Sequence, residues 1–361
     1  MIKVLVIDDS AVVRQVLTRI FDRAPDIECI GCAPDPFVAR EMIIDHRPDV
    51  LTLDIEMPRM DGLTFLSKLM RALPMPVVVV SSLTPRGSHM AAEALRLGAI
   101  AVLAKPGAAY TVGELGQQLV ETVRQARYAR VQRLATEVAV EPPQPLLTTT
   151  NKIFAIGAST GGTIAIEQLL RRFPHNAPGT LIVQHMPAYV TENFAQRLDG
   201  VSLVKVREAK DGDPIMPGVV LIAPGDHHMM LRRSGARYFV EISQGPPVNR
   251  HRPAVDVLFR SVAQTAGPST IAALLTGMGA DGAQGLLALR EAGAKTIAQD
   301  EGSSVVFGMP RVAIELGAAE RVLPLDRIAA KMFDLAQGRS VRASRSVVAS
   351  NNSDVSSGKG A

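Results

Sequence analysis

Short runs of β-branched and other apolar residues alternate with helix-period stretches along the first third of the chain. The apolar runs are KVLVI, DVLTL, PVVVV and AIAVLA, and stretches such as SAVVRQVLTRIF and GLTFLSKLMRAL lie between them. Strands that alternate with helices build a parallel sheet with helices on both faces. The pattern therefore predicts a doubly wound α/β domain over residues 1–124.

A second α/β pattern fills residues 151–338, after the regular pattern has weakened over 125–150. The intervening segment contains EPPQP and lacks periodic apolar positions, as is typical of an interdomain linker. Two alternating stretches around RRSGA predict a β-hairpin inside the second domain. The final segment, 339–361, is rich in Ser, Asn and Gly, and we expect it to be disordered.

Length and charge restrict the class of protein. The chain has 361 residues, of which 47% are hydrophobic, and 39 basic residues against 35 acidic ones give a net charge of +4. This length exceeds the size at which a single hydrophobic core usually stops growing, which favours two domains. A mild, dispersed positive charge argues against an electrostatically driven nucleic-acid binder. No apolar stretch approaches the roughly 18–20 residues that span a bilayer, and no leader precedes MIKVLVIDD, so we expect a cytosolic protein.

Cys29 and Cys32 form a CxxC pattern within IECIGCA, which predicts a strand. Residues three apart on a regular strand point to opposite faces. A redox CxxC pair also needs a helix N-terminus, and two cysteines alone cannot complete a four-ligand zinc site. The pattern favours cysteines that only pack in the core.

Carboxylates follow two predicted strands of the first domain. Asp8 and Asp9 end the first apolar run, and Asp54 ends the third. Because the carboxyl ends of parallel strands meet at one edge, these side chains should lie close together. Three carboxylates form a hard oxygen ligand set that suits Mg²⁺. Each acid alone would more often be a solvated strand end or a helix cap, so the interpretation depends on the group.

Ser159, His185 and Asp281 each lie where an apolar run of the second domain breaks into a turn, in KIFAIGASTGG, QHMP and TGMGADG. Loops at the carboxyl edge of a parallel sheet converge on one crevice, and a Ser-His-Asp relay needs only that convergence. The pattern predicts a serine hydrolase with Ser159 as nucleophile, His185 as general base and Asp281 as the orienting carboxylate. The turn after Ser159, including Thr160, can supply N–H donors to an oxyanion.

A dinucleotide-binding turn is the main alternative for GASTGG. Its glycines are spaced GxxxGG rather than GxGxxG, and no acidic residue closes the next strand, LIVQHMP. The order Ser, His, Asp also differs from the Ser, Asp, His order of α/β-hydrolases, which share G-x-S-x-G. The pattern indicates a Rossmann-like sheet with its own hydrolytic arrangement. His227 and His228, in APGDHHMM, lack further ligands at a useful spacing and predict a hairpin end rather than a metal site.

The motifs GASTGG, QHMP, HRPAVDVLF and GMGADG together resemble the catalytic domain of the CheB family of chemotaxis protein-glutamate methylesterases. VLVIDDS, LDIEMPRMDG, VVVVSS and LAKP resemble the flavodoxin-like receiver domain of response regulators, which forms the N-terminal half of that family. The resemblance covers nearly the whole chain except the linker and the tail. It implies phosphorylation-activated hydrolysis of glutamyl methyl esters, and deamidation of glutamines, on chemoreceptors.

The resemblance also implies roles for single residues. Asp54 would be the phosphorylated residue, with Mg²⁺ held by Asp9 and Asp54. Ser81 would hydrogen-bond the phosphoryl group, and Lys105 would pair with its oxygens. Met278 would lie at the oxyanion hole. The histidine kinase CheA would be the phosphodonor, and the unphosphorylated receiver would restrict access to the hydrolase site.

Two other classes of function stay open at this point. A phosphorylation-dependent transcription factor would also carry a receiver, although residues 151–338 lack a compact helical module with a basic recognition helix. A non-catalytic switch that only binds receptors would keep the fold without needing Ser159, His185 and Asp281 together. A DNA-binding assay addresses the first alternative, and methanol release from methylated receptors addresses the second.

Overall fold

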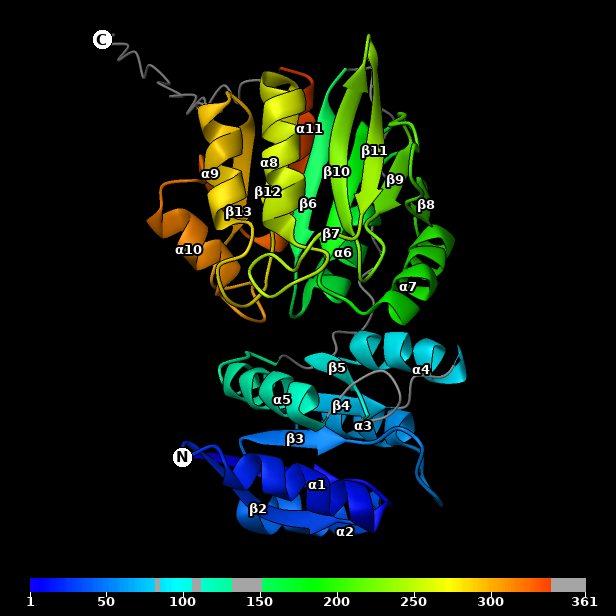
Figure 1. The fold of residues 1–361 in the computed structure, drawn as a ribbon, viewed down its shortest axis with the longest axis vertical. Helices are drawn as coiled ribbons and strands as arrows, with labels where there is room; N and C mark the ends of the chain where they lie inside the picture. The colour runs from blue at the N-terminus through cyan, green and yellow to red at the C-terminus, as the bar shows by residue number, and fades with distance from the viewer. Residues whose placement is uncertain (82–84, 106–111, 132–150, 339–361) are drawn as a thin grey trace, which may run out of the picture.

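The structure is a computed structural model that describes residues 1–81, 85–105, 112–131 and 151–338. Most of the predicted linker and the whole predicted tail lie outside these residues. Within them, no helix is both long and apolar enough to cross a membrane. The chain forms two α/β units that follow one another along the long axis of the molecule (Figure 1).

The first unit is a five-stranded parallel sheet in the order β2-β1-β3-β4-β5, which confirms the predicted doubly wound α/β domain. Its strands are β1 (Ile2–Ile7), β2 (Ile27–Ala33), β3 (Val50–Leu53), β4 (Val77–Ser81) and β5 (Ala101–Ala104). Its helices are α1 (Ala11–Asp22), α2 (Pro36–His46), α3 (Gly62–Ala72), α4 (Pro85–Arg96) and α5 (Val112–Ala126). Every residue of β3 and β4 is buried, because helices cover both faces of the sheet.

Side chains directly before α1, α2 and α3 cap these helices. The Ser10 hydroxyl accepts a hydrogen bond from the N–H of Val13, and Asp61 accepts one from the N–H of Thr64. Asp35 caps α2 in the same way. Such caps satisfy N–H groups that the first helical turn leaves unpaired. They help to fix where each of these helices begins.

The second unit is a seven-stranded parallel sheet in the order β14-β13-β12-β6-β7-β9-β8. Its strands are β6 (Ile153–Ala158), β7 (Gly179–Gln184), β8 (Lys205–Glu208), β9 (Val219–Ile222), β12 (Thr270–Leu274), β13 (Lys295–Gln299) and β14 (Arg321–Leu323). The chain starts at the central strand β6 and continues to β7 on one side, whereas β12 lies on the other. Beyond the carboxyl end of such a central strand, loops diverge and leave a crevice.

Two helical layers and a hairpin cover this sheet (Figure 1). The helices are α6 (Gly162–Leu170), α7 (Ala188–Val201), α8 (Val255–Thr265), α9 (Ala283–Glu291), α10 (Met309–Glu315) and α11 (Leu325–Ala336). The predicted hairpin is present as β10 (His228–Ser234) and β11 (Arg237–Ser243). Along β6, Ile153 and Ala155 pack with α8 and the hairpin, while Phe154 and Ile156 pack with α6 and α11. This alternation is the two-residue period of a strand that is buried on both faces.

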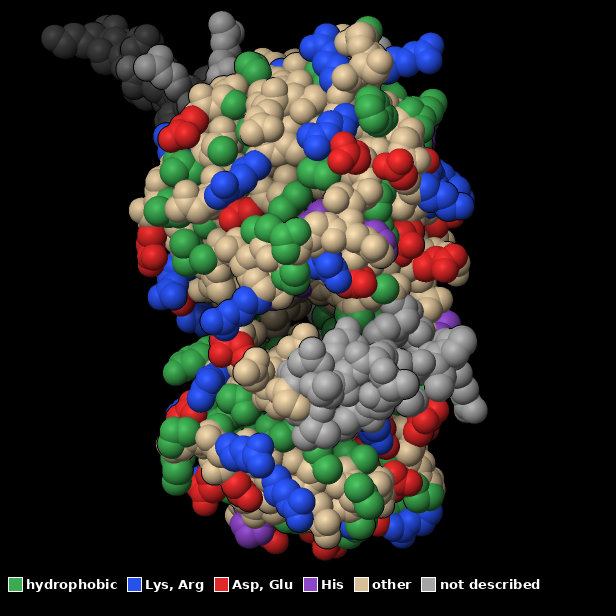
Figure 2. Space-filling model, viewed as in Figure 1, with side chains coloured by type: hydrophobic (Ala, Val, Ile, Leu, Met, Phe, Trp, Pro, Cys, Tyr) green, Lys and Arg blue, Asp and Glu red, His purple; other side chains and the backbone are tan. Residues whose placement is uncertain are grey.

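The two units touch through α4, which packs against α7 and α6. Met90 and Leu95 of α4 pack on the same apolar cluster as Phe194 of α7. Beyond α5, the N–H of Arg130 donates to the carbonyl of Val305 at 2.7 Å, and its guanidinium pairs with Glu301 at 2.7 Å. The surface is hollowed at this junction (Figure 2). The first unit is therefore attached beside the loops that follow β6 and β7.

Candidate active site

The turn after β6 holds Ser159 in a fixed position. The N–H of Ser159 donates to the carbonyl of Thr276 at 3.0 Å, and its own carbonyl accepts from Gly162 at 2.7 Å and from Gln184 Nε2 at 2.8 Å. Gly161 has a φ of +75°, and a Cβ there would lie 2.5 Å from the Cβ of Val305. Only glycine fits both that backbone conformation and that contact. The hydroxyl of Ser159 is thus presented at the start of α6.

The three residues predicted to form a relay lie in hydrogen-bond contact. Ser159 Oγ lies 3.0 Å from Nδ1 of His185, and Nε2 of His185 lies 2.7 Å from Oδ2 of Asp281. Because a carboxylate only accepts, the neutral imidazole carries its proton on Nε2. Nδ1 is then free to accept the hydroxyl proton of Ser159. The ends of β6, β7 and β12 bring these residues together, as the strand-end pattern predicts.

Several donors hold the Asp281 carboxylate in place. Oδ1 accepts from Asn249 Nδ2 at 2.8 Å and from the N–H of Asp256 at 3.2 Å, and Oδ2 accepts from the N–H of Val255 at 2.6 Å. Burial alone would raise the pKa of Asp281, but the hydrogen bond and electrostatic attraction of His185, with hydrogen bonds from Asn249 and Val255, lower it to about 2. Asp281 is therefore ionised at neutral pH.

A second histidine, His251, stacks on His185. The ring centroids of His185 and His251 lie 3.7 Å apart, with an interplanar angle of 12°. Burial lowers the pKa of His251 to about 3, and the neighbouring His185 acts in the same direction. A neutral ring therefore lies against His185 and restricts its rotation without adding charge.

The sequence pattern indicates no role for Asn249, His251 or Asp256. HRPAVDVLF carries a family resemblance, but the path of the loop before α8 does not follow from its polarity. One usable signal was the density of polar side chains, NRHR, directly before an apolar helix. Such a segment in a two-domain enzyme is a reasonable source of side chains that support a site.

Backbone N–H groups flank Ser159 on two sides. Within the described part of the chain, neither the N–H of Thr160 nor that of Met278 donates a hydrogen bond. The loop TGMGADG runs directly against Ser159, because a Cβ added to Gly277 would lie 2.8 Å from the Cβ of Ser159. Thr160 and Met278 are both half-buried. The arrangement can present N–H donors to a negatively charged oxygen formed next to Ser159.

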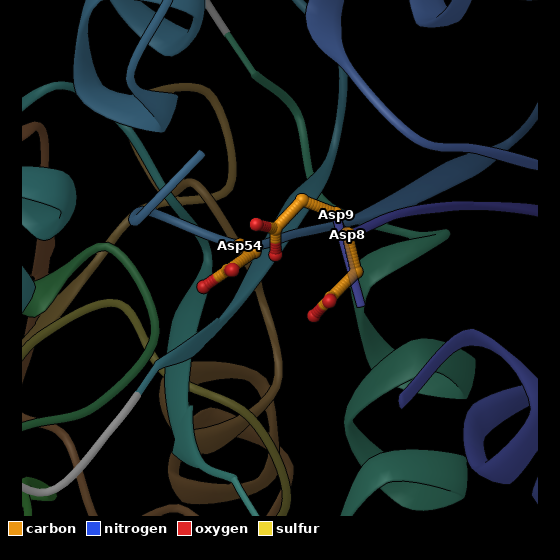
Figure 3. A group of neighbouring side chains, drawn as sticks. All are labelled: Asp8, Asp9 and Asp54. Atoms are coloured by element: carbon orange, nitrogen blue, oxygen red, sulfur yellow. The ribbon is translucent and has the colours of Figure 1, made fainter. Parts of the chain in front are cut away.

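An acidic group lies at the carboxyl edge of the first sheet. One carboxylate oxygen from each of Asp8, Asp9 and Asp54 lies within 4.8 Å of the other two (Figure 3). Lys105 Nζ lies 2.9 Å from Asp8 and 2.7 Å from Asp54. Burial raises the pKa of Asp54, although its contact with Lys105 opposes this. Two of these acids are buried and Asp9 is exposed, so the group opens to solvent on one side.

Ser81 supplies an unsatisfied hydroxyl near this group. It ends β4, next to β3, and its Oγ is buried without a hydrogen-bond partner among the residues described. The carbonyl of Ser81 accepts from the N–H of Lys105 at 2.8 Å, which ties the two side chains to one edge. Buried polar atoms normally have a partner, so this hydroxyl fits a site that receives an oxygen-bearing ligand.

Comparison with known proteins agrees with this geometry. The family model described as the response regulator receiver domain matches residues 4–114, and the CheB methylesterase model matches residues 154–332. A protein-glutamate methylesterase/protein-glutamine glutaminase from Anaeromyxobacter dehalogenans is 58% identical over 338 residues, covering 93% of this chain and 95% of the relative. One from Pseudomonas aeruginosa is 53% identical over 342 residues, covering 94% and 98%.

A solved structure is similar to the second unit. The crystal structure of the Thermotoga maritima CheB methylesterase catalytic domain is 41% identical, with a TM-score of 0.50, and covers 51% of this chain and 98% of that domain. The relatives match nearly end to end, and the two family models follow one another as the two folded units do. The chain belongs to the CheB methylesterase family, with a response regulator receiver domain in front of the catalytic domain.

Proposed function

We propose that this protein hydrolyses γ-glutamyl methyl esters on chemoreceptors, and deamidates glutamines there, under control of its receiver. The observation that carries the proposal is the continuous set of contacts from Ser159 Oγ through His185 to Asp281. It occurs in a chain 58% identical to a protein named for both activities. A non-catalytic switch would not need these contacts. Residues 154–332 match an enzyme family, which also disfavours a transcription factor.

Ser159 is the nucleophile in this proposal. Nδ1 of His185 takes the hydroxyl proton as Oγ attacks the ester carbonyl, and the N–H groups of Thr160 and Met278 donate to the oxyanion. His185 then gives the proton to the departing methanol, which leaves a glutamyl ester on Ser159. Water, activated by the same nitrogen, hydrolyses that ester. An amide substrate releases ammonia at the first step instead of methanol.

Asp281 and His251 keep His185 ready for both proton transfers. The ionised carboxylate holds the proton on Nε2 and stabilises the imidazolium that forms when Nδ1 is protonated. The stacked ring of His251 stays neutral, so it does not repel that positive charge. The contact with Asp281 sets the tautomer of His185, and the contact with His251 sets the plane of its ring.

Asp54 is the proposed phosphorylated residue of the receiver. Asp9 and Asp54 would hold Mg²⁺ with Asp8 beside them, and the buried hydroxyl of Ser81 and the ammonium of Lys105 would contact the phosphoryl oxygens. When bound, Mg²⁺ neutralises charge on the incoming phosphoryl group. The three-carboxylate set fits a hard cation of this kind. A histidine kinase of the chemotaxis pathway is the proposed phosphodonor.

A time course of methanol release from methylated receptor membranes tests the proposal. We expect release by the protein alone and faster release after a small-molecule phosphodonor is added. A protein that releases no methanol under either condition would contradict the esterase assignment. A protein that releases methanol at one unchanged rate would contradict only the control by the receiver.

Replacing Asp54 with asparagine should leave the basal esterase rate and remove the stimulation. The amide keeps the shape of the side chain but lacks the accepting oxygen. Coupling between sites of this kind usually amounts to about 5-fold to 150-fold, and all of it should be lost. Chelation of divalent cations should give the same phenotype in the unmodified protein.

Asp45→Asn, which alters an exposed acid of the same unit, is the matched control. Uptake of labelled phosphate by the Asp54→Asn protein would show that another residue is the acceptor.

A fragment of residues 151–338 should hydrolyse receptor esters faster than the unphosphorylated full chain. The contact of α4 with α6 and α7 lies next to the loops that carry Ser159 and His185, so the receiver hinders a large substrate. We expect an increase of about fivefold or more, with no response to phosphodonor. The comparison is made at equal concentrations of folded protein. A fragment slower than the full chain would show that the receiver or the linker helps to bind the substrate.

A further inference from the structure

Cys29 and Cys32 lie on the same face of β2, which corrects the prediction that they point apart. Along β1, Val4 pairs with Cys29, Leu5 with Gly31 and Val6 with Cys32. Ile30 is therefore an extra residue, a β-bulge, that the regular two-residue period does not contain. Because of the bulge, the two cysteines take the positions that residues two apart have on a regular strand. Such residues share a face.

The bulge brings the two thiols within reach of each other. Positions two apart on β1 are separated by about 6.6 Å, given a rise of roughly 3.3 Å per residue. Disulfides join Cα atoms that lie about 4.4–6.8 Å apart, so the pair falls inside that range. Both sulfur atoms also converge on one hydroxyl, Thr18 Oγ1, at 3.7 Å from Cys29 Sγ and 3.4 Å from Cys32 Sγ.

The surroundings make the two thiols unequal. The neighbouring thiol of Cys29, with smaller contributions from Thr18 and the charge of Arg14, lowers the pKa of Cys32 to about 6, although burial opposes this shift. The neighbouring Cys32, together with burial, raises the pKa of Cys29. The carbonyls of Asp8 and Asp9 hold the Arg14 guanidinium, at 2.8 Å and 2.9 Å. A thiolate at Cys32 thus lies beside a protonated thiol at Cys29.

Small molecules can reach Cys32 from solvent. Both cysteines are half-buried rather than enclosed. Cys32 lines an open surface cavity of about 340 Å³, together with Arg14, Gln15 and Thr18. The chain contains no other cysteine, so the pair has no competing intramolecular partner. None of these residues belongs to the esterase site.

We propose that Cys29 and Cys32 form a dithiol that hydrogen peroxide oxidises to an intramolecular disulfide. The thiolate of Cys32 attacks the peroxide oxygen, the O–O bond breaks, and Cys32 becomes a sulfenic acid while hydroxide leaves and takes up a proton as water. The sulfur of Cys29 then attacks the sulfenic sulfur, and a second water leaves. Two thiols are oxidised and one peroxide is reduced to two waters. A dithiol reductant reverses the reaction.

Hydrogen peroxide is the probe, added in equimolar amount to the full chain that has been freed of reductant. The oxidised protein should remain a monomer, contain no free thiol and weigh two hydrogen atoms less than the reduced protein. Dithiothreitol should restore the two thiols and the original mass. In Cys29→Ser the reaction should stop at the sulfenic acid of Cys32, which dimedone traps. In Cys32→Ser the remaining thiol should react at least about tenfold more slowly than Cys32 does in Cys29→Ser.

Measurement in urea shows whether the difference in reactivity between the two cysteines depends on the folded structure. Unfolding should remove the difference between the two single-cysteine variants, because the bulge and the charge of Arg14 are then lost. Disulfide-linked dimers without the intramolecular product would overturn the proposal. So would sulfinic acid at Cys32 as the main wild-type product, or equal rates for the two variants in the folded state. Circular dichroism of each variant confirms that it is folded when it is compared.

Discussion

Ester hydrolysis should fall by about 10⁴-fold or more when Ser159 is replaced with alanine, with the protein still folded. The substitution removes the oxygen that attacks the carbonyl and leaves the hydrogen bonds of the turn, which involve backbone groups of Ser159. Ser159 is half-buried, and its hydroxyl contacts His185 Nδ1 at 3.0 Å. Loss of that hydrogen bond should cost only about 1 kcal/mol of stability. Methanol release and thermal unfolding measure the two effects separately.

Two further variants make this result specific. His185→Gln should be nearly as inactive as Ser159→Ala, and the double variant should be no worse, since members of a relay fail as a unit. Ser234→Ala changes an exposed serine in the hairpin and should keep full activity. Near-native methanol release by a well-folded Ser159→Ala protein would contradict the assignment of the nucleophile.

The fold could be predicted because a strand buried on both faces appears in the sequence as a continuous run of apolar residues. β4 is the continuous run VVVVS, and β6 is buried throughout, so each could be placed from composition alone. The residues that follow such strands converge at one edge of the sheet by topology. For that reason Ser159, His185 and Asp281 could be predicted to meet although 122 positions, from 159 to 281, separate the first from the last.

Features set by single residues in loops and bulges could not be predicted in this way. One extra residue, Ile30, moves Cys32 to the face of β2 that Cys29 occupies, because the side-chain period of a strand is two. Gly31, next to the bulge, was the one local indication, since glycine within a strand often marks such a place. Asn249 and His251 reach Asp281 and His185 from a loop whose course depends on tertiary packing.

Replacing Asp281 tests whether the tautomer of His185 matters for ester hydrolysis as much as the nucleophile does. Asp281→Asn should lower methanol release by about 10³-fold to 10⁴-fold. If the new amide group turns its oxygen toward His185, its NH₂ faces the donors of Asn249 and Asp256. If it turns its NH₂ toward His185, the ring proton must move to Nδ1, which then cannot accept the hydroxyl proton of Ser159. Four donors meet this carboxylate, so neither orientation of an amide satisfies all of them.

The same conflict should destabilise the fold by about 1–3 kcal/mol, because buried donors are left unpaired. Stability and catalysis must therefore be separated, and Asp256→Asn is the matched control. Asp256 is a buried neighbour that accepts from Asn249 Nδ2 at 2.9 Å and from the N–H of Gly285 at 2.7 Å, and it makes no hydrogen bond to His185 within the described structure.

We expect Asp256→Asn to lower the unfolding temperature as Asp281→Asn does, but to keep activity within about tenfold of the unmodified protein, since the tautomer of His185 is preserved. Methanol release is measured well below both unfolding temperatures, so that each variant is compared while folded. Equal losses of activity in the two variants would mean that the network of Asn249 acts only by shaping the loop. A large loss confined to Asp281→Asn would show that the proton on Nε2 is what the carboxylate supplies to catalysis.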